Sequence, residues 1–408
     1  MQLKSIKELK NLKGKKVLLR LAYDVPLEAK GTGWVVADIR RITETIPTIK
    51  YLLKQQCGLV ILSWLDRPGG KIVEKYRMDP VAKALSKILK KPVRKLDDCI
   101  GPKVFSEIKN LKPGKILMLE NSRFYPEEEK NNRRFAKLLV HGLDLVVFDA
   151  FAQSHRIHAS TVGILELLPA YAGFLMVKEL KALSLVCQRP KKPLVLVMGG
   201  AKITDKVAVL QQLIKIADKV LIGGGIANIF LKALSVPIGS SFVQDELINS
   251  AGWKKINSVR VAKKIYKLNK DKVILPVDFL AGNKIDGHSL IEVVNISKKE
   301  VIDRRWKFLD IGPDTISEFV SVISKAGTIF WNGPMGVFEI DKFGLGTKKI
   351  AQAISKSKAI TVAGGGDTEA AVIKYKLGGK FSHLSTGGGA SLVFVSGKEL
   401  PVLKYLTK

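Results

Sequence analysis

The sequence predicts an α/β protein of two lobes, each built on a parallel sheet with helices on both faces. Short apolar runs rich in β-branched residues alternate with amphipathic stretches along the 408 residues, and continuous apolar strands are typical of parallel sheets buried on both faces. These runs fall into two groups, one in each half of the chain. A long amphipathic stretch separates the groups, so we expect an interdomain helix and hinge to join the two lobes.

Each lobe is expected to use the strands of its own half of the chain. In the first half the expected strands are 16–21, 58–63, 115–120 and 144–149, and in the second half they are 193–199, 219–223, 272–276, 328–331 and 359–363. The joining helix is expected at 167–185. In such sheets ligands bind beyond the carboxyl ends of the strands, so the residues that follow each strand are candidates for a site.

The chain is strongly basic, with 68 Lys and Arg against 37 Asp and Glu and a formal net charge of +31. This charge raises nucleic acid or an anionic membrane as a partner. The lysines are scattered, however, and are not interleaved with aromatic residues as a single-strand binding platform requires. No apolar run has the length of a membrane span, and the lysine-rich N-terminus lacks the apolar stretch of a signal peptide. We therefore expect a cytoplasmic protein with no membrane partner and at most nonspecific nucleic-acid binding.

The three cysteines exclude two classes of site. Cys57, Cys99 and Cys187 are far apart and form no CxxC pair, so neither a disulfide framework nor a zinc site is indicated.

Glycine-rich turns in the second half predict a phosphate-binding face. Glycine lets the backbone approach an anion closely, and a helix N-terminus offers unpaired N–H groups. Taken singly, each turn could equally be an ordinary strand-to-helix connection. The turns are GGAKITDK (199–206), IGGGIANIF (222–230), FWNGPMGVFE (330–339), GGGDT (364–368) and HLSTGGGAS (383–391). No P-loop or GxGxxG spacing occurs, so a nucleotide would be held in another way, with Lys202 and Lys206 supplying point charges.

Arginines follow the strands of the first half. The guanidinium fork matches both phosphate and carboxylate groups, although an arginine taken alone more often belongs to a surface ion pair. The arginines are Arg20, Arg41, Arg67, Arg123 and Arg156.

The chain resembles the phosphoglycerate kinase family from about residue 10 to its end. The motifs that carry the resemblance are LENSRFYPEEEKN, DAFAQSHRIHAST, LLPAYAGFLMVKEL, GGAKITDK, IGGGIANIF, LDIGP, WNGPMGVFE, GGGDT and HLSTGGGAS. The resemblance implies a triose lobe at 1–170 for 3-phosphoglycerate or 1,3-bisphosphoglycerate, an interdomain helix and hinge at 171–188, and a nucleotide lobe at 189–385 for Mg-ATP or Mg-ADP. It also implies that 386–408 returns toward the N-terminal lobe and that the protein is a monomer.

The resemblance also implies roles for individual residues. The residues it places in catalysis are Arg41, Lys202, Gly366 and Gly389. Those it places on the triose are Arg20, Asp24, Arg41, Arg67, Arg123 and Arg156. Those it places on the nucleotide are Gly200, Lys202, Lys206, Gly224, Asn332, Pro334, Glu339, Gly366, Asp367 and Thr368, with Asp367 associated with Mg²⁺. Phosphoryl transfer between ADP and an acyl phosphate has anionic groups on both sides and needs no general base, so His155 and His158 are expected to hold a loop.

The triose motifs depart from the family pattern, whereas the nucleotide motifs are nearly intact. Ala22 and Asp24 stand where the family has Asp and Asn, and Trp64 and Asp66 stand where it has His and Gly. If the first strand continued through these positions, residues 22 and 24 would face the same way. A working kinase is the main hypothesis. A nucleotide-binding paralogue with another acid substrate or no catalysis, and a polyanion-binding protein, stay open as alternatives.

Overall fold

The computed structural model describes residues 2–201, 204–244, 246–248, 255–298, 300 and 302–408. The chain forms two compact units, of which unit 1 is Met1–Leu180 with Glu399–Lys408 and unit 2 is Lys181–Lys398. The finer boundaries expected from the sequence stay a prediction.

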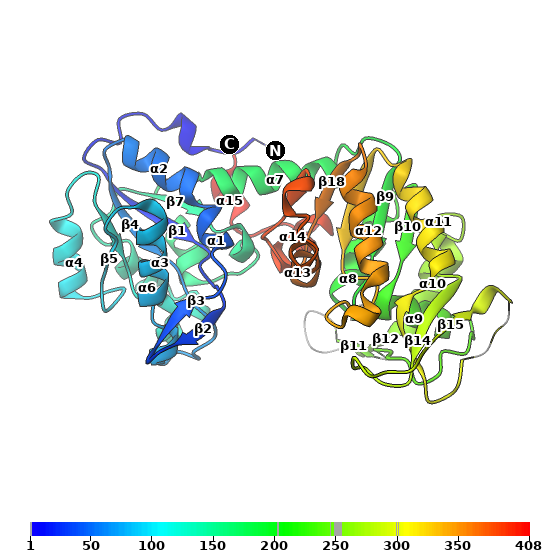
Figure 1. Ribbon diagram of the computed structural model, residues 1–408. Coiled ribbons are helices and arrows are strands. Elements are labelled where there is room, and N and C mark those ends of the chain that lie inside the picture. Colours follow the sequence, from blue (N-terminus) through cyan, green and yellow to red (C-terminus); the bar gives the residue numbers. More distant parts are fainter. Residues whose placement is uncertain (1, 202–203, 245, 249–254, 299, 301) are drawn as a thin grey trace. The chain divides into compact units, whose positions relative to one another are not determined.

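Unit 1 is built on a six-stranded sheet in which every neighbouring pair runs parallel. In spatial order the strands are β5 (Arg94–Lys95), β6 (Ile116–Met118), β4 (Gly58–Leu62), β1 (Lys16–Leu21), β7 (Leu145–Asp149) and β8 (Ala170–Ala172). The helices of this part of the chain are α1 (Arg40–Thr43), α2 (Ile46–Lys54), α3 (Asp79–Leu89), α4 (Pro102–Lys109), α5 (Pro126–Glu129), α6 (Arg133–Leu139), the first part of α7 (Phe174–Cys187) and α15 (Leu403–Leu406) (Figure 1).

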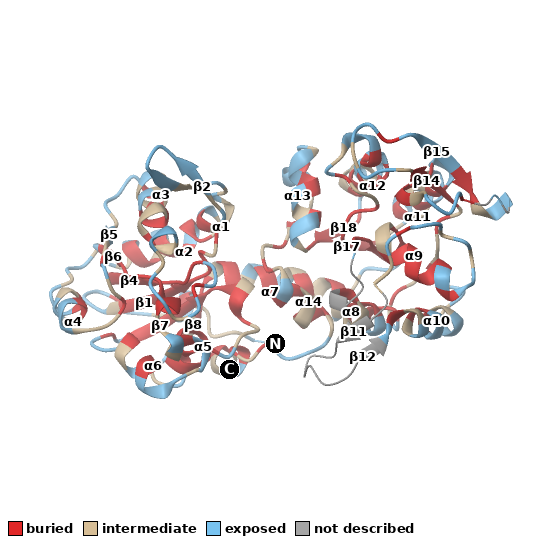
Figure 2. Ribbon diagram, turned by 90° about the horizontal axis from the view of Figure 1, so that it is seen from below, coloured by how far each residue is buried: buried red, intermediate tan, exposed pale blue. Residues whose placement is uncertain are grey.

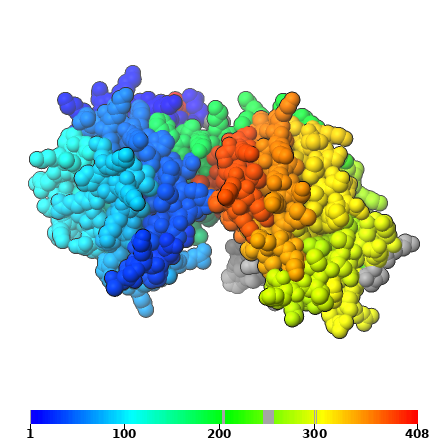
Figure 3. Space-filling view, in the orientation of Figure 1, coloured from blue at the N-terminus to red at the C-terminus, as the bar shows by residue number. Residues whose placement is uncertain are grey.

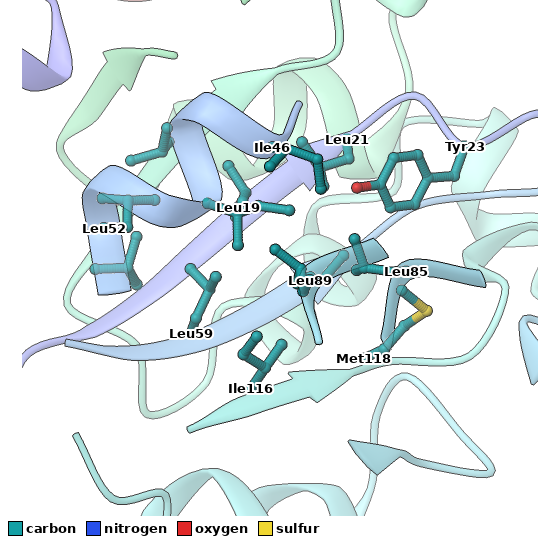
Figure 4. Packing of buried hydrophobic residues seen from close by; sticks show 14 of the residues in the cluster. Leu19, Leu21, Tyr23, Ile46, Leu52, Leu59, Leu85, Leu89, Ile116 and Met118 are labelled. Atoms are coloured by element: carbon teal, nitrogen blue, oxygen red, sulfur yellow. The ribbon is translucent and has the colours of Figure 1, made fainter. Parts of the chain in front are cut away.

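The core of unit 1 follows from the alternation of side chains along its strands. Leu19 and Leu59 point to the same face of the sheet, where Leu52 from α2 and Leu85 from α3 pack against them (Figure 4). Helix α6 lies on the other face, and the strands between the helical layers are buried (Figure 2). An exposed hairpin of β2 (Leu27–Lys30) and β3 (Gly33–Val36) lies at the surface of the unit (Figure 3).

Unit 2 repeats the three-layer plan with a second six-stranded sheet in which every neighbouring pair is again parallel. The strand order is β13 (Val273–Ile274), β10 (Lys219–Ile222), β9 (Leu194–Met198), β17 (Thr328–Asn332), β18 (Ile360–Ala363) and β19 (His383–Leu384). Its helices are α8 (Thr204–Leu213), α9 (Gly224–Ala233), α10 (Ser258–Leu268), α11 (Pro313–Ser324), α12 (Leu345–Lys356), α13 (Gly366–Lys374) and α14 (Gly389–Val395).

Unit 2 also contains strands that the sequence did not predict. An antiparallel sheet combines β14 (Asp278–Gly282), β15 (Ile291–Asn295) and β16 (Lys307–Ile311), and β11 (Glu246–Ile248) pairs with β12 (Lys255–Asn257). The nine strands expected from the sequence are all present, with ends that differ by at most two residues.

The joining helix begins later than the sequence predicts, at Phe174 instead of residue 167. Pro169 has no N–H and disfavours helix at the residue before it, and the residues that follow it form β8 beside β7. Asp149 then marks the start of α7, because its Oδ1 accepts the N–H of Met176 at 2.8 Å. Gly173 fits there since a Cβ would lie 2.2 Å from Cγ of Asp149.

Candidate active site

Arg20 lies fully buried in β1 of unit 1. Its Nε donates to the carbonyl oxygen of Ser160 at 2.9 Å and to Oγ of the same residue at 3.1 Å, and its Nη1 donates to the carbonyl of Leu21. Nη2 has no hydrogen-bond partner within the described residues. Burial lowers the pKa of Arg20 to about 9. One edge of a buried guanidinium is thus available for an anionic group.

Arg123 is a second buried guanidinium of unit 1, with 3% of the residue exposed. It belongs to the 3₁₀ turn Ser122–Phe124 that follows β6. Its Nη1 donates to the carbonyl of Asp66 at 2.7 Å, and its Nη2 lies 3.2 Å from a carboxylate oxygen of Glu129. Burial lowers the pKa of Arg123, and the nearby charge of Arg156 lowers it further.

One buried carboxylate that acts on both arginines belongs to Glu128. Glu128 is fully buried, and its carboxylate accepts the hydroxyl of Ser160 at 2.5 Å and the backbone N–H of the same residue at 3.1 Å. Burial raises the pKa of Glu128, while the charges of Arg20 and Arg123 lower it. Nothing in the local sequence pattern separates Glu128 and Ser160 from neighbouring Glu and Ser residues, so neither is predicted as a site residue.

The other predicted triose residues differ in how the structure relates them to this pair. Nη1 of Arg41 in α1 donates to the carbonyl of Asp24 at 2.6 Å. Arg156 is half-buried, and its charge lowers the pKa of both Arg123 and His158. Arg67 lies exposed, with its backbone N–H on Oδ1 of Asp66 at 2.8 Å. The structure therefore places Arg20, Arg123 and Arg156 near one another and links Arg41 to them through Asp24.

The first strand does not continue through residues 22 and 24, so the condition under which they would face the same way is not met. β1 ends at Leu21, and the N–H of Val25 closes a tight turn onto the carbonyl of Tyr23 at 3.0 Å. Ala22 is buried, whereas Asp24 is half-buried and its Oδ1 accepts the N–H of Asp66 at 2.8 Å.

The two histidines of this region are neutral at neutral pH. Burial lowers the pKa of His155 and that of His158 to about 4, with the charge of Arg156 contributing in both cases. The backbone N–H of His158 donates to Oγ1 of Thr161 at 2.9 Å. Neither imidazole adds a positive charge to the arginines.

In unit 2 the glycine turns gather at one edge of the sheet, because parallel strands end on the same side. The N–H of Gly200, after β9, donates to the carbonyl of Pro334, after β17, at 2.6 Å. The N–H of Gly224, after β10, donates to the carbonyl of Met335 at 3.0 Å. Turns from three strands are thereby fixed against one another.

The backbone geometry of two turns requires glycine. Gly200 has φ of +87°, and a Cβ there would lie 3.1 Å from Nζ of Lys206. Gly224 has φ of +57°, and its Cβ would lie 2.7 Å from the backbone N of Gly200. Left-handed φ values with such close neighbours exclude larger residues. Lys206 is buried in the first turn of α8, and Lys202 lies outside the described residues.

A cavity of about 520 Å³ opens at these turns. Its polar edge includes Gly200, Gly224, Pro334, Glu339 and Asp367, and its apolar wall includes Phe242, Phe308, Leu309, Val337 and Ile340. An apolar wall with a few polar groups is typical of small-molecule sites of this size.

Two predicted nucleotide residues support the turns instead of lining the cavity. Nδ2 of Asn332 donates to the carbonyl of Gly364 at 2.6 Å, and Oγ1 of Thr368 accepts the N–H of Gly333 at 2.7 Å. Both side chains are buried. Gly366 and the exposed Asp367 open α13, so Asp367 presents its carboxylate beside the cavity.

Gly389 opens the short helix α14 behind a turn that serine side chains hold. Oγ of Ser385 lies 2.6 Å from Oγ of Ser391 and accepts the N–H of Gly387 at 3.2 Å. This turn follows β19, the last strand in the parallel order of unit 2.

Among the residues that the structure describes, no helix combines the length and apolar character needed to cross a bilayer. In the same part of the chain, no three or more His, Cys, Asp and Glu side chains form a group able to hold a metal ion.

Comparisons with known proteins agree with the resemblance seen in the motifs. The family model described as phosphoglycerate kinase matches residues 6–398. The chain is 44% identical to the phosphoglycerate kinase of Rubrobacter xylanophilus over 406 residues, covering 100% of this chain and 98% of that one. It is also 44% identical to the phosphoglycerate kinase of Dictyoglomus turgidum, covering 97% and 96%.

Solved structures give the same result. The phosphoglycerate kinase structure from Coxiella burnetii is 37% identical, with a TM-score of 0.84 over 99% of both chains. That from Pyrococcus horikoshii is 33% identical, with a TM-score of 0.84 over 98% of both chains. With the family model matching nearly the whole length, the chain belongs to the phosphoglycerate kinase family and is a phosphotransferase.

Proposed function

We propose that the protein catalyses reversible phosphoryl transfer between 1,3-bisphosphoglycerate and Mg-ADP, giving 3-phosphoglycerate and Mg-ATP in glycolysis. The arginines of unit 1 bind the triose acid, and the glycine turns of unit 2 bind the adenine nucleotide. The proposal also makes the protein a monomer of the cytoplasm, without a membrane or nucleic-acid partner.

The observation that carries the nucleotide half is the cavity at the carboxyl ends of the unit 2 strands. Its apolar wall suits the faces of a purine base, and Glu339 at its edge suits a ribose hydroxyl. Backbone N–H groups and the ammonium of Lys206 beside Gly200 suit phosphate oxygens. Asn332 and Thr368 contribute by holding the turns in place.

The excess of buried positive charge supports the triose half. Arg20 and Arg123 are desolvated, and each has a guanidinium nitrogen without a partner in the described chain. An acid that carries a carboxylate and a phosphate supplies the missing acceptors and charge. Arg41 and Arg156 extend the cluster at less buried positions.

Catalysis in this scheme depends on position and charge alone. Both the donor and the acceptor oxygens are anionic, so no proton has to be removed, and the neutral His155 and His158 need not take part. Arg41, Lys202 and backbone N–H groups at Gly366 and Gly389 stabilise charge on the transferred phosphoryl group.

Mg²⁺ fits as a companion of the nucleotide. Asp367 is an exposed carboxylate at the start of α13 beside the cavity, and Mg²⁺ in kinases is commonly held by one or two carboxylates together with phosphate oxygens and water. The bound ion would neutralise phosphate charge that Asp367 would otherwise repel.

The test is steady-state formation of ADP from Mg-ATP by the purified protein, with and without 3-phosphoglycerate and with other small carboxylic acids. The proposal expects turnover that saturates with 3-phosphoglycerate. Turnover with a different acid and none with 3-phosphoglycerate would favour the altered paralogue, for which Ala22, Asp24 and Trp64 are the relevant changes. Absence of turnover with every acid would overturn the proposal.

A further inference from the structure

Trp64 lies against both buried guanidinium groups of unit 1. The Cζ atom of Arg20 is 4.3 Å from the centroid of the Trp64 ring, and the Cζ atom of Arg123 is 4.4 Å from it. The indole is 1% exposed, so water does not weaken either contact. One aromatic side chain thus touches two cations that belong to different strand-end segments.

The backbone around Trp64 is fixed on both sides. Oγ of Ser63 accepts the N–H of Tyr23 at 2.9 Å, and the carbonyl of Leu65 accepts Nδ2 of Asn121 at 2.7 Å. The carbonyl of Asp66 accepts Nη1 of Arg123. Because hydrogen bonds hold the chain at Ser63 on one side of Trp64 and at Leu65 and Asp66 on the other, the position of the indole is set by the fold.

Two close guanidinium groups repel each other, so the charge on one makes the protonated form of the other less favourable. The charge of Arg123 lowers the pKa of Arg20, in addition to the larger effect of burial. The carboxylate of Glu128 offsets part of this repulsion, since its charge raises the pKa of Arg20, but each further carboxylate would also repel an anionic substrate. The face of an aromatic ring attracts cations without carrying a net charge. Trp64 can therefore hold the two arginines while the cluster keeps its positive charge for the ligand.

A third neighbour of Trp64, the ring of His158, agrees with this interpretation. The ring of His158 lies 5.1 Å from the ring of Trp64, centroid to centroid, at an interplanar angle of 43°. The imidazole is neutral at neutral pH, since burial lowers its pKa to about 4. It packs against the indole without bringing a third positive charge to the cluster.

We propose that Trp64 is a positioning residue for the acid substrate, which holds the guanidinium groups of Arg20 and Arg123 through contacts with its aromatic ring. The proposal rests on the proposed function, in which these arginines bind 3-phosphoglycerate. The proposal gives a physical reason for Trp64 in place of the family's histidine. A histidine at this position would offer a smaller aromatic face and would titrate near neutral pH.

The test compares Trp64→Phe, which keeps an aromatic face, with Trp64→Leu, which keeps an apolar side chain but has no ring. Phe135→Leu is the matched control, since Phe135 is a buried aromatic residue of the same unit that packs against the ring of Tyr125. For each variant KM is measured separately for 3-phosphoglycerate and for Mg-ATP, and Tm is measured on the same samples.

The proposal expects Trp64→Leu to raise KM for 3-phosphoglycerate by about tenfold and Trp64→Phe by no more than about threefold. KM for Mg-ATP stays unchanged in both variants, and Phe135→Leu lowers Tm without changing either KM. Equal KM values for 3-phosphoglycerate in Trp64→Leu and Trp64→Phe would overturn the proposal, as would parallel increases for both substrates. If the unmodified protein does not turn over 3-phosphoglycerate, the proposed function fails first, and the two failures are thereby distinguished.

Discussion

Oδ1 of Asp24 accepts a hydrogen bond from the backbone N–H of Asp66 at a distance of 2.8 Å. Both residues are departures from the family pattern, in which Asn and Gly stand at these positions. Asp66 has φ of +57°, a left-handed conformation that Asp tolerates better than most residues. The two changes therefore meet in one contact that fixes the loop below Arg123, whose Nη1 donates to the carbonyl of Asp66.

Asp24→Asn is expected to strengthen binding of 3-phosphoglycerate by about three- to tenfold, because it removes a negative charge that acts on Arg20 and Arg123. The amide oxygen can still accept the N–H of Asp66, so Tm should be unchanged. Calorimetric titration measures the affinity. Asp24→Ala is the control and should lower stability by about 1 kcal/mol through loss of the acceptor. Weaker binding by Asp24→Asn would mean that the carboxylate itself serves the ligand.

Arg41→Ala is expected to lower turnover by at least about a hundredfold with little change in Tm, since the guanidinium is proposed to stabilise charge on the transferred group. Its neighbour Arg40 provides a matched control on the same short helix. Nε of Arg40 lies 3.1 Å from Oδ1 of Asp38, and this partly exposed pair should matter little to the reaction. Similar turnover in Arg41→Ala and Arg40→Ala would remove Arg41 from the catalytic assignment.

Asp367→Asn is expected to raise KM for Mg-ATP by about tenfold and to leave KM for 3-phosphoglycerate unchanged, because the carboxylate stands only at the nucleotide cavity. Asp341→Asn is the control, as that exposed carboxylate lies 2.6 Å from Nζ of Lys374 and does not line the cavity. The initial rate is measured over a range of each substrate. If both variants gave the same KM for Mg-ATP, Asp367 would have no role in binding the metal nucleotide.

His158→Gln is expected to reduce the loss of folding stability that the protein shows when the pH is lowered. The pKa of His158 is lowered to about 4 in the folded protein, while an unfolded histidine titrates near 6.5. The unfolded chain therefore binds more protons between these values, so stability falls as the pH drops through this window. Asp149 acts in the opposite direction, because its raised pKa of about 7 makes stability fall as the pH rises. This contribution is the same in the variant and in the unmodified protein.

Thermal melts at pH 7 and about pH 5 should show a smaller decrease in Tm for the variant than for the unmodified protein. Equal decreases would show that His158 does not contribute.

The sequence predicts the parallel sheets well because their strands are continuous apolar runs bounded by turns. The strands β14 to β16 escape prediction, since the buried Asp278 and Asp310 interrupt the apolar runs of β14 and β16 and since Ile291 and Val293 of β15 are exposed. The late start of α7 depends on the pairing of β8 with β7 and on the contact between Gly173 and Asp149, which join segments distant in sequence.

In the candidate site, too, features set by local sequence could be predicted, whereas features set by contacts between distant segments could not. The glycine turns are visible as motifs, because positive φ values and close backbone approach demand that residue type. The burial of Arg20 is not visible, since it depends on Trp64 and Ser160 from two other segments of the chain. The sequence identified Trp64 as a departure from the family, but only the structure shows the two guanidinium groups against its ring.

The central claim, that the arginine cluster holds the acid and the glycine turns hold the nucleotide, is tested most directly by calorimetric titration of the unmodified protein and of Arg123→Ala. The unmodified protein should bind both 3-phosphoglycerate and Mg-ADP. Arg123→Ala should bind 3-phosphoglycerate at least about thirtyfold more weakly and Mg-ADP with unchanged affinity. Unchanged binding of 3-phosphoglycerate by Arg123→Ala, or equal weakening of both ligands, would contradict it.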